Sequence, residues 1–386
     1  MPPIETFDYL IVGGGASGLL LAEAMGSDPW FAGKRIALIE KEAEKANDRT
    51  WCFWEEGEGR FDGIAARTWD AIRFRGKGFE LRTSLLPMRY KMVRGEDFYR
   101  EFRARLGTMP NVHLIYAEVS GFREAADQVH VETDRGNFIA ARVFSSVYLG
   151  DFNRLMQPYP LIWQHFAGWR IRTEQPVFDP GAATFMDFGI PQNGHTCFMY
   201  ILPESPCEAL VEYTLFSADL LPDPAYQAAL KSYVEKELRP GGYRILEREA
   251  GKIPMTCNNF AVANTARIQH IGLAGGWAKP STGYAFANTV RNTARLLSRI
   301  KAGKTPAAPP RKNRYWYYDL LLLDILYHRN AEGSRIFENL FRKQDPRLIL
   351  AFLQEDTSVA EDLRIIAACP TRLFLRAFWN RLLRGF

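Results

Sequence analysis

Near the start of the chain, glycines occur at the spacing of a dinucleotide-binding turn. Gly13, Gly15 and Gly18 form a G-x-G-x-x-G pattern between the apolar, strand-like run Phe7–Val12 and the helix-like run LLLAEAM. In such a turn the first glycine permits the bend, the second lets the backbone approach a pyrophosphate, and the third lets helix and strand pack closely. The alternative is a glycine-rich turn without a ligand. Strand, glycines and helix nevertheless occur here in the order that a nucleotide site requires.

Two further features indicate which nucleotide this turn would hold. Glu40, 22 positions after Gly18, ends the strand-like run RIALIE and can accept hydrogen bonds from both ribose hydroxyls. A turn in the first βαβ unit of a chain is typical of proteins that hold FAD there, which favours FAD over NAD. The helix N-terminus offers its free N–H groups to the phosphates. The expected contacts from this part of the chain are Gly13, Gly15, Ala16, Ser17, Gly18 and Glu40.

A late glycine-rich segment, residues 272–288, is similar to the second stretch that contacts FAD in flavoproteins. A strand over His270–Ala274 is expected to meet a helix over Gly283–Ile300, with Thr282 as the candidate N-cap and the N-terminal amides facing the flavin ring. Flavin hydroxylases usually carry Gly-Asp where this strand ends, whereas a Gly-Gly pair stands here, which disfavours a hydroxylase. The segment adds to the expected cofactor contacts Gly275, Gly276, Thr282, Gly283 and Tyr284.

The elements that must position these residues alternate between strand-like and helix-like patterns. Residues 95–106 predict an amphipathic helix, residues 112–118 a strand, and residues 129–147 a hairpin. Many short β-prone runs between residues 155 and 255 predict an antiparallel sheet. The expected fold class is therefore α/β: a Rossmann-type FAD-binding domain in the two-domain architecture of flavin hydroxylases, an antiparallel-sheet substrate domain and a helical C-terminal segment.

With 386 residues the chain has room for about two domains. The FAD-binding domain is expected over residues 1–154 and 263–301, with an insertion from the substrate domain near residues 50–92. Residues 155–262 are expected to form the mainly antiparallel substrate domain. Residues 302–386 are expected to form a helical, basic region that faces a membrane.

Composition narrows the possible ligands and compartments. The aromatic share of 13% is high and suggests that a large apolar ligand needs lining. The five cysteines are scattered without a C-x-x-C pair and the six histidines lack ligand spacing, so we expect no metal and a reducing compartment. No signal peptide precedes the first strand and no apolar run reaches the ~20 residues of a membrane span. We therefore expect a cytoplasmic protein.

Positive charge is concentrated at the end of the chain. From Lys301 onward there are 15 basic and 9 acidic residues, a net charge of +6, whereas the first 300 residues hold 34 and 35. Basic residues that alternate with Leu, Phe and Trp favour an anionic membrane surface over nucleic acid. An interfacial helix is expected over Thr371–Phe386, with the basic residues Arg372, Arg376, Arg381 and Arg384. The alternative is a helix docked on the protein, its arginine stems lying along apolar surface.

Four further segments resemble the bacterial, FAD-requiring lycopene beta-cyclases, and the resemblance extends over about residues 5–300. Asn47–Trp54 (NDRTWCFW) is similar to the D-R-T-W-C-F-W segment of that family, and Gln164–Arg170 is similar to its Q-x-F-x-G-W strand. Phe185–Phe188 resembles its M-D-F segment, and Val211–Thr214 stands at its acidic E-x-T signature. The late glycine-rich segment is also similar to the cyclase form of the flavin segment.

The acidic signature singles out one residue. Related cyclases often carry two neighbouring acids there, whereas this chain has Tyr213 beside Glu212, which leaves Glu212 as the single candidate acid in the signature. An alkene is a poor base, so the acid that protonates it must be neutral, although a free glutamic acid with a pKa of about 4.3 is mostly ionised at pH 7. Burial beside apolar walls raises such a pKa. Glu212 stands in the apolar run ALVEYTLF, with a solvated strand glutamate as the alternative.

The resemblance implies that the ψ-ends of lycopene, or of another ψ-ended carotenoid, are cyclised to β-ionone rings without net redox change. It further implies reduced FAD, with NAD(P)H as the source of electrons, and Glu212 as the general acid. Arg49 is a candidate contact to the flavin or its phosphates, with a surface salt bridge as the alternative. The candidate pocket residues, each with core packing as the alternative, are Trp51, Phe53, Trp54, Trp163, Phe166, Trp169 and Tyr213.

Two other functions stay open at this point. A flavin-dependent oxidoreductase on a hydrophobic substrate, such as a hydroxylase or a prenyl-chain reductase, would share the fold. A carrier of carotenoid or flavin would need no acid at all. The missing Gly-Asp pair and the D-R-T-W-C-F-W run favour the cyclase over the oxidoreductase, and an acid on an apolar strand disfavours the carrier. The cyclase would be an isomerase that works at the inner face of the cytoplasmic membrane, to which it is peripherally attached.

Overall fold

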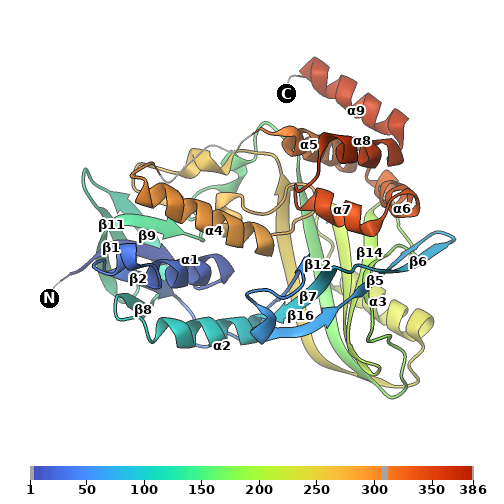
Figure 1. The fold of residues 1–386 in the computed structure, drawn as a ribbon, viewed down its shortest axis with the longest axis horizontal. Helices are drawn as coiled ribbons and strands as arrows, with labels where there is room; N and C mark the ends of the chain where they lie inside the picture. The colour runs from blue at the N-terminus through green and yellow to red at the C-terminus, as the bar shows by residue number, and fades with distance from the viewer. Residues whose placement is uncertain (1–3, 306–311, 385–386) are drawn as a thin grey trace.

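The apolar run before the glycine turn forms β1 (Glu5–Val12), a central strand in the first of two seven-stranded sheets (Figure 1). The computed structural model describes residues 4–305 and 312–384. The order of this sheet is β8–β2–β1–β11–β10–β9, with β17 also paired to β11. Its other strands are β2 (Ile36–Glu40), β8 (Val112–Tyr116), β9 (Val119–Glu124), β10 (Val129–Thr133), β11 (Gly136–Ser145) and β17 (Ile268–His270).

Three helices cover one face of this sheet: α1 (Ala16–Gly26), α2 (Gly95–Leu106) and α4 (Phe286–Lys301) (Figure 1). The alternation of side chains along β1 explains why. Tyr9 and Ile11 pack into the same core as residues of these helices, whereas Leu10 and Val12 pack on the opposite face with Val129 and other strand residues. The parallel strands are apolar on both faces because both faces are buried.

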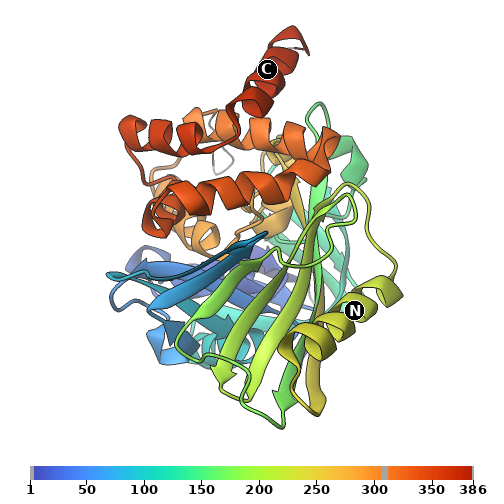
Figure 2. The ribbon, with the colours of Figure 1, turned by 90° about the vertical axis from the view of Figure 1, so that its right-hand side faces the viewer.

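The second sheet has the order β16–β12–β15–β14–β13–β5–β6 and is antiparallel except where β13 pairs with β5 (Figure 2). Its strands are β5 (Ala71–Gly76), β6 (Phe79–Ser84), β12 (Leu161–Thr173), β13 (Ala183–Asp187), β14 (Thr196–Ser205), β15 (Glu208–Ser217) and β16 (Tyr243–Thr256). A small third sheet, in the order β3–β7–β4, is formed by β3 (Thr50–Glu56), β4 (Ala65–Trp69) and β7 (Met88–Arg94).

The two faces of the second sheet have different neighbours. Odd-numbered residues of β12 and β15, such as Trp169 and Tyr213, pack with Leu230 of α3 (Asp223–Tyr233). Even-numbered residues of β15, such as Phe216, pack in a different core with Phe337 and other residues of the C-terminal helices. Strand alternation therefore decides which side chains face α3 and which face the interior between the sheet and these helices.

The sequence predicted several of these elements correctly. The α/β class is confirmed, the helix over residues 95–106 is α2, and the hairpin predicted over residues 129–147 is β10 paired with β11. Two predictions near the late glycine segment are wrong. The strand expected over His270–Ala274 ends at His270 and gives way to a short 3₁₀ turn.

The helix expected from Gly283 begins only at Phe286, as α4. Gly283 has a φ of +70°, a left-handed conformation that an α-helix does not use. Thr282 therefore does not cap the helix; Ala285 occupies the N-cap position, without a side-chain hydrogen bond. The segment before α4 is an irregular turn instead of the helix N-terminus that the sequence predicted.

Five helices follow: α5 (Arg314–His328), α6 (Gly333–Lys343), α7 (Pro346–Leu353), α8 (Val359–Ala368) and α9 (Thr371–Arg384). Figures 1 and 2 show them as a layer beside one end of the second sheet, with α9 outermost. No helix within residues 4–305 and 312–384 is long and apolar enough to cross a membrane. The last two positions of the expected interfacial helix, Gly385 and Phe386, lie outside the described residues.

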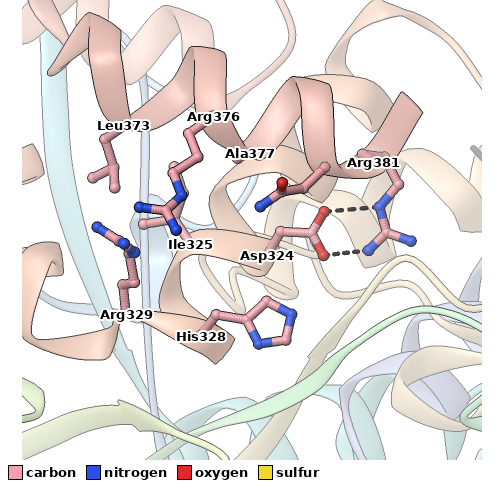
Figure 3. A pocket seen from close by; sticks show the side chains of 9 residues that line it. Asp324, Ile325, His328, Arg329, Leu373, Arg376, Ala377 and Arg381 are labelled. Carbon is pink, nitrogen blue, oxygen red and sulfur yellow. Dashed lines mark hydrogen bonds and ion pairs between the residues drawn. The ribbon is translucent and has the colours of Figure 1, made fainter. Parts of the chain in front are cut away.

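Helix α9 is attached to α5 by a buried ion pair. Arg381 is 7% exposed, and its Nε donates to Asp324 Oδ2 at 2.8 Å, while its Nη2 donates to the other carboxylate oxygen (Figure 3). The prediction that Arg381 faces a membrane surface is therefore wrong, because its charge is matched inside the protein. Arg372 and Arg376 of the same helix are exposed.

Replacing Arg381 with methionine should destabilise the protein strongly. Arg381→Met leaves the Asp324 carboxylate buried without its partner, which costs about 3–5 kcal/mol in the free energy of unfolding. The double variant Arg381→Met/Asp324→Leu should recover most of that loss, since an apolar pair replaces the ion pair. Denaturant titration measures the free energy of unfolding of the single and the double variant. Arg376→Met, at an exposed arginine of the same helix, is the control. Equal stability of Arg381→Met and Arg376→Met would show that the ion pair does not hold α9.

Candidate active site

A cavity of about 410 Å³ lies between the glycine turn, the second sheet and the C-terminal helices. Its volume is in the range of small-molecule sites, about 300–1,000 Å³. Its lining joins segments that are far apart in the sequence. From the first sheet and its turns come Gly15, Ala16, Ser17, Ser146 and Gly272; from the second sheet come Gln164, Phe166, Phe198, Tyr200, Glu212, Thr214 and Phe216.

The glycine turn forms one wall and has the features of a phosphate site. At Gly15, the residue before α1, no protein atom lies within 4 Å of where a side-chain Cβ would be. Among the described residues no side chain caps the N-terminus of α1, so its first backbone N–H groups remain for a ligand. A Cβ on Gly18, by contrast, would lie 1.9 Å from the carbonyl oxygen of Gly13, so glycine is required for α1 to approach β1. These residues fit a dinucleotide phosphate group.

Of the residues predicted in the late segment, Thr282, Gly283 and Tyr284 line the cavity, as do Gly272 and Leu273, which the sequence did not single out. Gly275 and Gly276 instead shape the 3₁₀ turn and its exit. Two buried polar atoms at the cavity, Thr282 Oγ1 and Gln164 Oε1, have no hydrogen-bond partner among the described residues. Buried polar atoms are rarely left without a partner, so this part of the cavity fits a polar ligand such as a flavin ring.

Glu40 and Arg49 already have partners within the protein. Glu40 accepts a hydrogen bond from the backbone N of Gly14 at 2.5 Å and pairs with Lys45 at 2.8 Å. Although burial alone would raise it, the hydrogen bond and charge of Lys45 hold the pKa of Glu40 below its usual value. Arg49 lines the cavity and pairs with the neighbouring Asp48, its Nη2 2.7 Å from Oδ2. Arg49 therefore forms the salt bridge that the sequence offered as the alternative, and its contact with a flavin or its phosphates stays a prediction.

Glu212 lies in a row that crosses four strands of the second sheet. Tyr200 of β14 is paired with Glu212 of β15, Glu212 with Gly168 of β12, and Gly168 with Glu249 of β16. A Cβ on Gly168 would lie 2.9 Å from Cγ of Glu212 and 3.1 Å from Cγ of Glu249. The absence of a side chain at this position therefore lets the two carboxyl groups meet above the glycine.

The two carboxyl groups affect each other's protonation. Burial, then the charge of Glu249 and a hydrogen bond with it, raise the pKa of Glu212 well above its usual value. Burial also raises the pKa of Glu249, although hydrogen bonds from Glu212 and from Thr50, whose Oγ1 lies 2.9 Å from Glu249 Oε2, act in the opposite direction. The hydrogen bond between the two groups therefore favours the proton on Glu212 over Glu249.

Glu249 is the functional residue that sequence reasoning missed. The signature left Glu212 as the single candidate acid, but β16 brings a second acid to within hydrogen-bonding contact of it. One signal was available: Glu247, Glu249 and Gly251 alternate along a strand-like run, which places them on one face. The register that puts Glu249 beside Gly168 was not available from the sequence.

The predicted aromatic pocket is corrected by strand alternation. Of the seven candidates, Trp51 and Phe166 line the cavity. Trp163, Trp169 and Tyr213 have odd numbers on β12 and β15, so they point to the opposite face of the sheet from Phe166 and Glu212. There the indole nitrogen of Trp169 donates to Gln227 of α3 at 2.9 Å.

The other two aromatic candidates, Phe53 and Trp54, are buried in the protein core. Phe53 stacks on Phe286 at 5.0 Å between ring centroids, and the indole nitrogen of Trp54 donates to the carbonyl of Leu350 at 3.2 Å. The C-terminal helices contribute a lining that the sequence did not predict. This apolar wall consists of Phe337, Leu340, Phe341, Ile349 and Leu353 from α6 and α7, with Phe185 and Met186 from β13.

Comparison with known proteins places this fold and site in a family. Residues 8–378 of the chain match a protein family described as "Lycopene cyclase protein". A lycopene beta-cyclase of Paracoccus sp. (strain N81106 / MBIC 01143) is 29% identical over 223 residues, 54% of this chain and 56% of that protein. A lycopene beta-cyclase of Pantoea ananas is 25% identical over 302 residues, 75% of this chain and 74% of that protein. The chain thus spans little more than half the length of the Paracoccus relative.

Solved structures share the fold at low sequence identity. A geranylgeranyl bacteriochlorophyll reductase-like protein from Thermoplasma acidophilum has a TM-score of 0.62 at 13% identity, over 97% of this chain and 99% of that one. A flavoprotein/dehydrogenase from Cytophaga hutchinsonii has a TM-score of 0.59 at 13% identity, over 90% and 92%. These likenesses confirm the predicted flavoprotein fold class. Because the family match extends over nearly the whole sequence, the chain belongs to the lycopene cyclase family.

Proposed function

We propose that this protein cyclises the ψ-ends of lycopene, or of another ψ-ended carotenoid, to β-ionone rings, with Glu212 as the general acid. The observation that carries the proposal is a buried carboxyl group in a cavity with apolar walls. Burial and the neighbouring Glu249 raise the pKa of Glu212, and Phe185, Phe198 and Phe341 line the same space. A hydrocarbon offers no hydrogen bonds, so its removal from water by such walls supplies the binding energy.

The chemistry requires one proton to be given and one to be lost. The Glu212 carboxyl gives its proton to C2 of the terminal double bond, a tertiary cation forms at C1, the ring closes, and C6 loses a proton. Substrate and product then have the same composition, so the enzyme is an isomerase. Rings that line the cavity, such as Trp51 and Tyr284, can stabilise the cation by about 0.5–2 kcal/mol each. The apolar walls exclude water, which would otherwise capture the cation.

We further propose that FAD is the cofactor, bound in its reduced form, with NAD(P)H as the reductant. The glycine turn and residues 272–284 would hold it, as the free N-terminus of α1 and the unpartnered Thr282 and Gln164 oxygens support. When bound, the reduced group supplies negative charge, which stabilises a developing cation. A reaction without net electron transfer could depend on a reduced cofactor for this reason.

The proposed route of the substrate is from the inner face of the cytoplasmic membrane, by way of the C-terminal helices. Apolar side chains of α8 and α9 are exposed, among them Leu363, Trp379 and Leu383, the last at 86%. Arg372 and Arg376 on α9 are also exposed and would add about 1 kcal/mol each near an anionic surface. An apolar patch with basic residues beside it fits a peripheral attachment to lipid.

Gly15→Ala should weaken FAD binding without unfolding the protein. The added Cβ has space in the protein but would stand where the backbone approaches the phosphates. We expect the dissociation constant of FAD to rise at least about tenfold, which is about 1.4 kcal/mol, in a fluorescence titration of the apoprotein. Gly33→Ala is the matched control, because Gly33 has equally open surroundings at the other end of β2. Equal FAD affinities would contradict a nucleotide at this turn.

Glu212→Gln should abolish cyclisation while FAD stays bound. Glutamine keeps the shape but carries no proton to give, so a loss of at least about a hundredfold is expected. The test is expression in a lycopene-accumulating bacterium, followed by pigment analysis and measurement of the FAD content of the purified protein. A β-ringed product from the unchanged protein supports the proposal. An oxygenated or reduced pigment would indicate an oxidoreductase instead, and unchanged lycopene a carrier.

Membrane binding should depend on the exposed apolar side chains of α9. Replacing Trp379 and Leu383 together with serine removes apolar area that would enter the bilayer, and we expect at least about a tenfold weaker partition onto anionic phospholipid vesicles. Vesicle sedimentation measures the partition, and added salt should weaken it further because the arginine contribution is screened. Val262→Ser changes an exposed apolar residue elsewhere, 66% exposed, and is the control. Unchanged partition of the α9 variant would leave this helix a structural role only.

A further inference from the structure

Glu249 has a position that the proposed reaction does not yet use. It lies across Gly168 from Glu212 and receives a hydrogen bond from Thr50 of β3. Thr50 belongs to the NDRTWCFW segment, so the most specific sequence feature of the chain supplies a contact to this acid. The arrangement requires four separate elements, β3, β12, β15 and β16, to meet at one point.

The two acids face different surroundings. Glu212 is 7% exposed and lines the 410 Å³ cavity with its apolar walls. Glu249 instead lines a separate, small polar pocket together with Arg94 and Arg170, and its side chain is only partly buried. Thr50 belongs to the lining of both. Arg94 pairs with Glu247, and Arg170 pairs with Glu204, Glu208 and Glu247, so these two guanidinium groups are already neutralised. A negative charge is nevertheless better tolerated in the polar pocket, where Thr50 donates to Glu249, than in the apolar cavity.

We propose that Glu249 is the positioning residue for the general acid Glu212. Glu249 stays ionised and holds the proton on Glu212. Once Glu212 has given that proton away, the pair of carboxylates acts as a base. This inference rests on the proposed function and assigns a second carboxylate to it. After Glu212 protonates C2, both carboxylates are negative and lie next to each other. The proton that C6 releases then returns to Glu212, so each turnover gives one proton and recovers one, with no further reactant.

Other charged groups around the pair act on Glu249 in opposite directions. The charges of Glu247 and Asp48 disfavour a negative charge on Glu249, and Arg49 attracts it. On the cavity side, burial raises the pKa of Cys52 and of Tyr284, so both face Glu212 as neutral groups. The negative charge of Glu249 is therefore the nearest one that keeps Glu212 protonated.

The test uses the FAD-loaded protein and the variant Glu249→Gln, which keeps the size of the side chain and removes its charge. The acid must be protonated, so activity is present below the pKa of Glu212 and is lost as pH rises through it. Without the charge of Glu249 that pKa falls. We expect the alkaline loss of cyclisation to move at least one pH unit lower. Glu249→Asp keeps the charge and should restore most of the shift.

A second measurement follows the protonation of Glu212 directly and does not depend on cyclisation. The infrared C=O band of the protonated carboxyl, assigned by its loss in Glu212→Gln, should disappear at a lower pH in Glu249→Gln than in the unchanged protein. Gly168→Ala should have the same effect, because its Cβ would separate the two side chains. Glu80→Gln is the control, since Glu80 is exposed on β6, at the far edge of the same sheet, and lines neither cavity.

The outcomes separate this inference from the proposed function. A band and a pH profile that move in Glu249→Gln and Gly168→Ala, and stay in place in Glu80→Gln, support the role of Glu249. If the unchanged protein forms no β-ringed product, the proposed function fails, while the infrared titration still decides whether Glu249 keeps the proton on Glu212. If the unchanged protein cyclises lycopene but Glu249→Gln titrates like Glu80→Gln, the inference about Glu249 is overturned and the function stands.

Discussion

The proposed reaction depends on keeping the carboxyl group of Glu212 uncharged inside an apolar cavity. An isolated carboxylate there would be very costly, so burial raises the pKa of this group. Two carboxyl groups in contact share one proton, since two adjacent negative charges repel each other. Gly168 makes this contact possible, because any side chain at that position would separate Glu212 from Glu249. The electrostatics of the site therefore rest on the absence of one side chain in the middle of a strand.

The second sheet serves the site and the fold at once. Each strand residue points either to the cavity or to α3, so Phe166 contributes to one and Trp169 to the other. The glycine in the strand weakens that strand locally. Its neighbours compensate, because β12 pairs along most of its length with both β15 and β16. A rigid three-strand unit thus holds the two acids in place, as a site that relies on a defined distance requires.

The features that the sequence predicted are local ones. The G-x-G-x-x-G turn, the amphipathic helix α2 and the β10–β11 hairpin are specified by residues that are neighbours in the chain. The position of Glu249 depends on which strands pair and in which register, and Glu249 lies 37 positions after Glu212. The same holds for Trp169 and Tyr213: their alternation is visible in the sequence, but the face that would border a cavity is not. The start of α4 was misplaced because glycine and threonine are common at helix N-termini as well as in irregular turns.

The C-terminal segment has two parts with different tasks, and a charge count could not separate them. Helices α6 and α7 close the cavity with Phe337, Phe341 and Ile349, whereas α8 and α9 expose apolar side chains outward. Arg381 raises the net charge of the segment, but its guanidinium is neutralised by Asp324 and anchors α9 to α5. This anchor fixes which face of α9 points outward. In the proposed function, a substrate leaving the bilayer would therefore meet the same layer of helices that closes the cavity over Glu212, and the distance from lipid to acid would be the thickness of that layer.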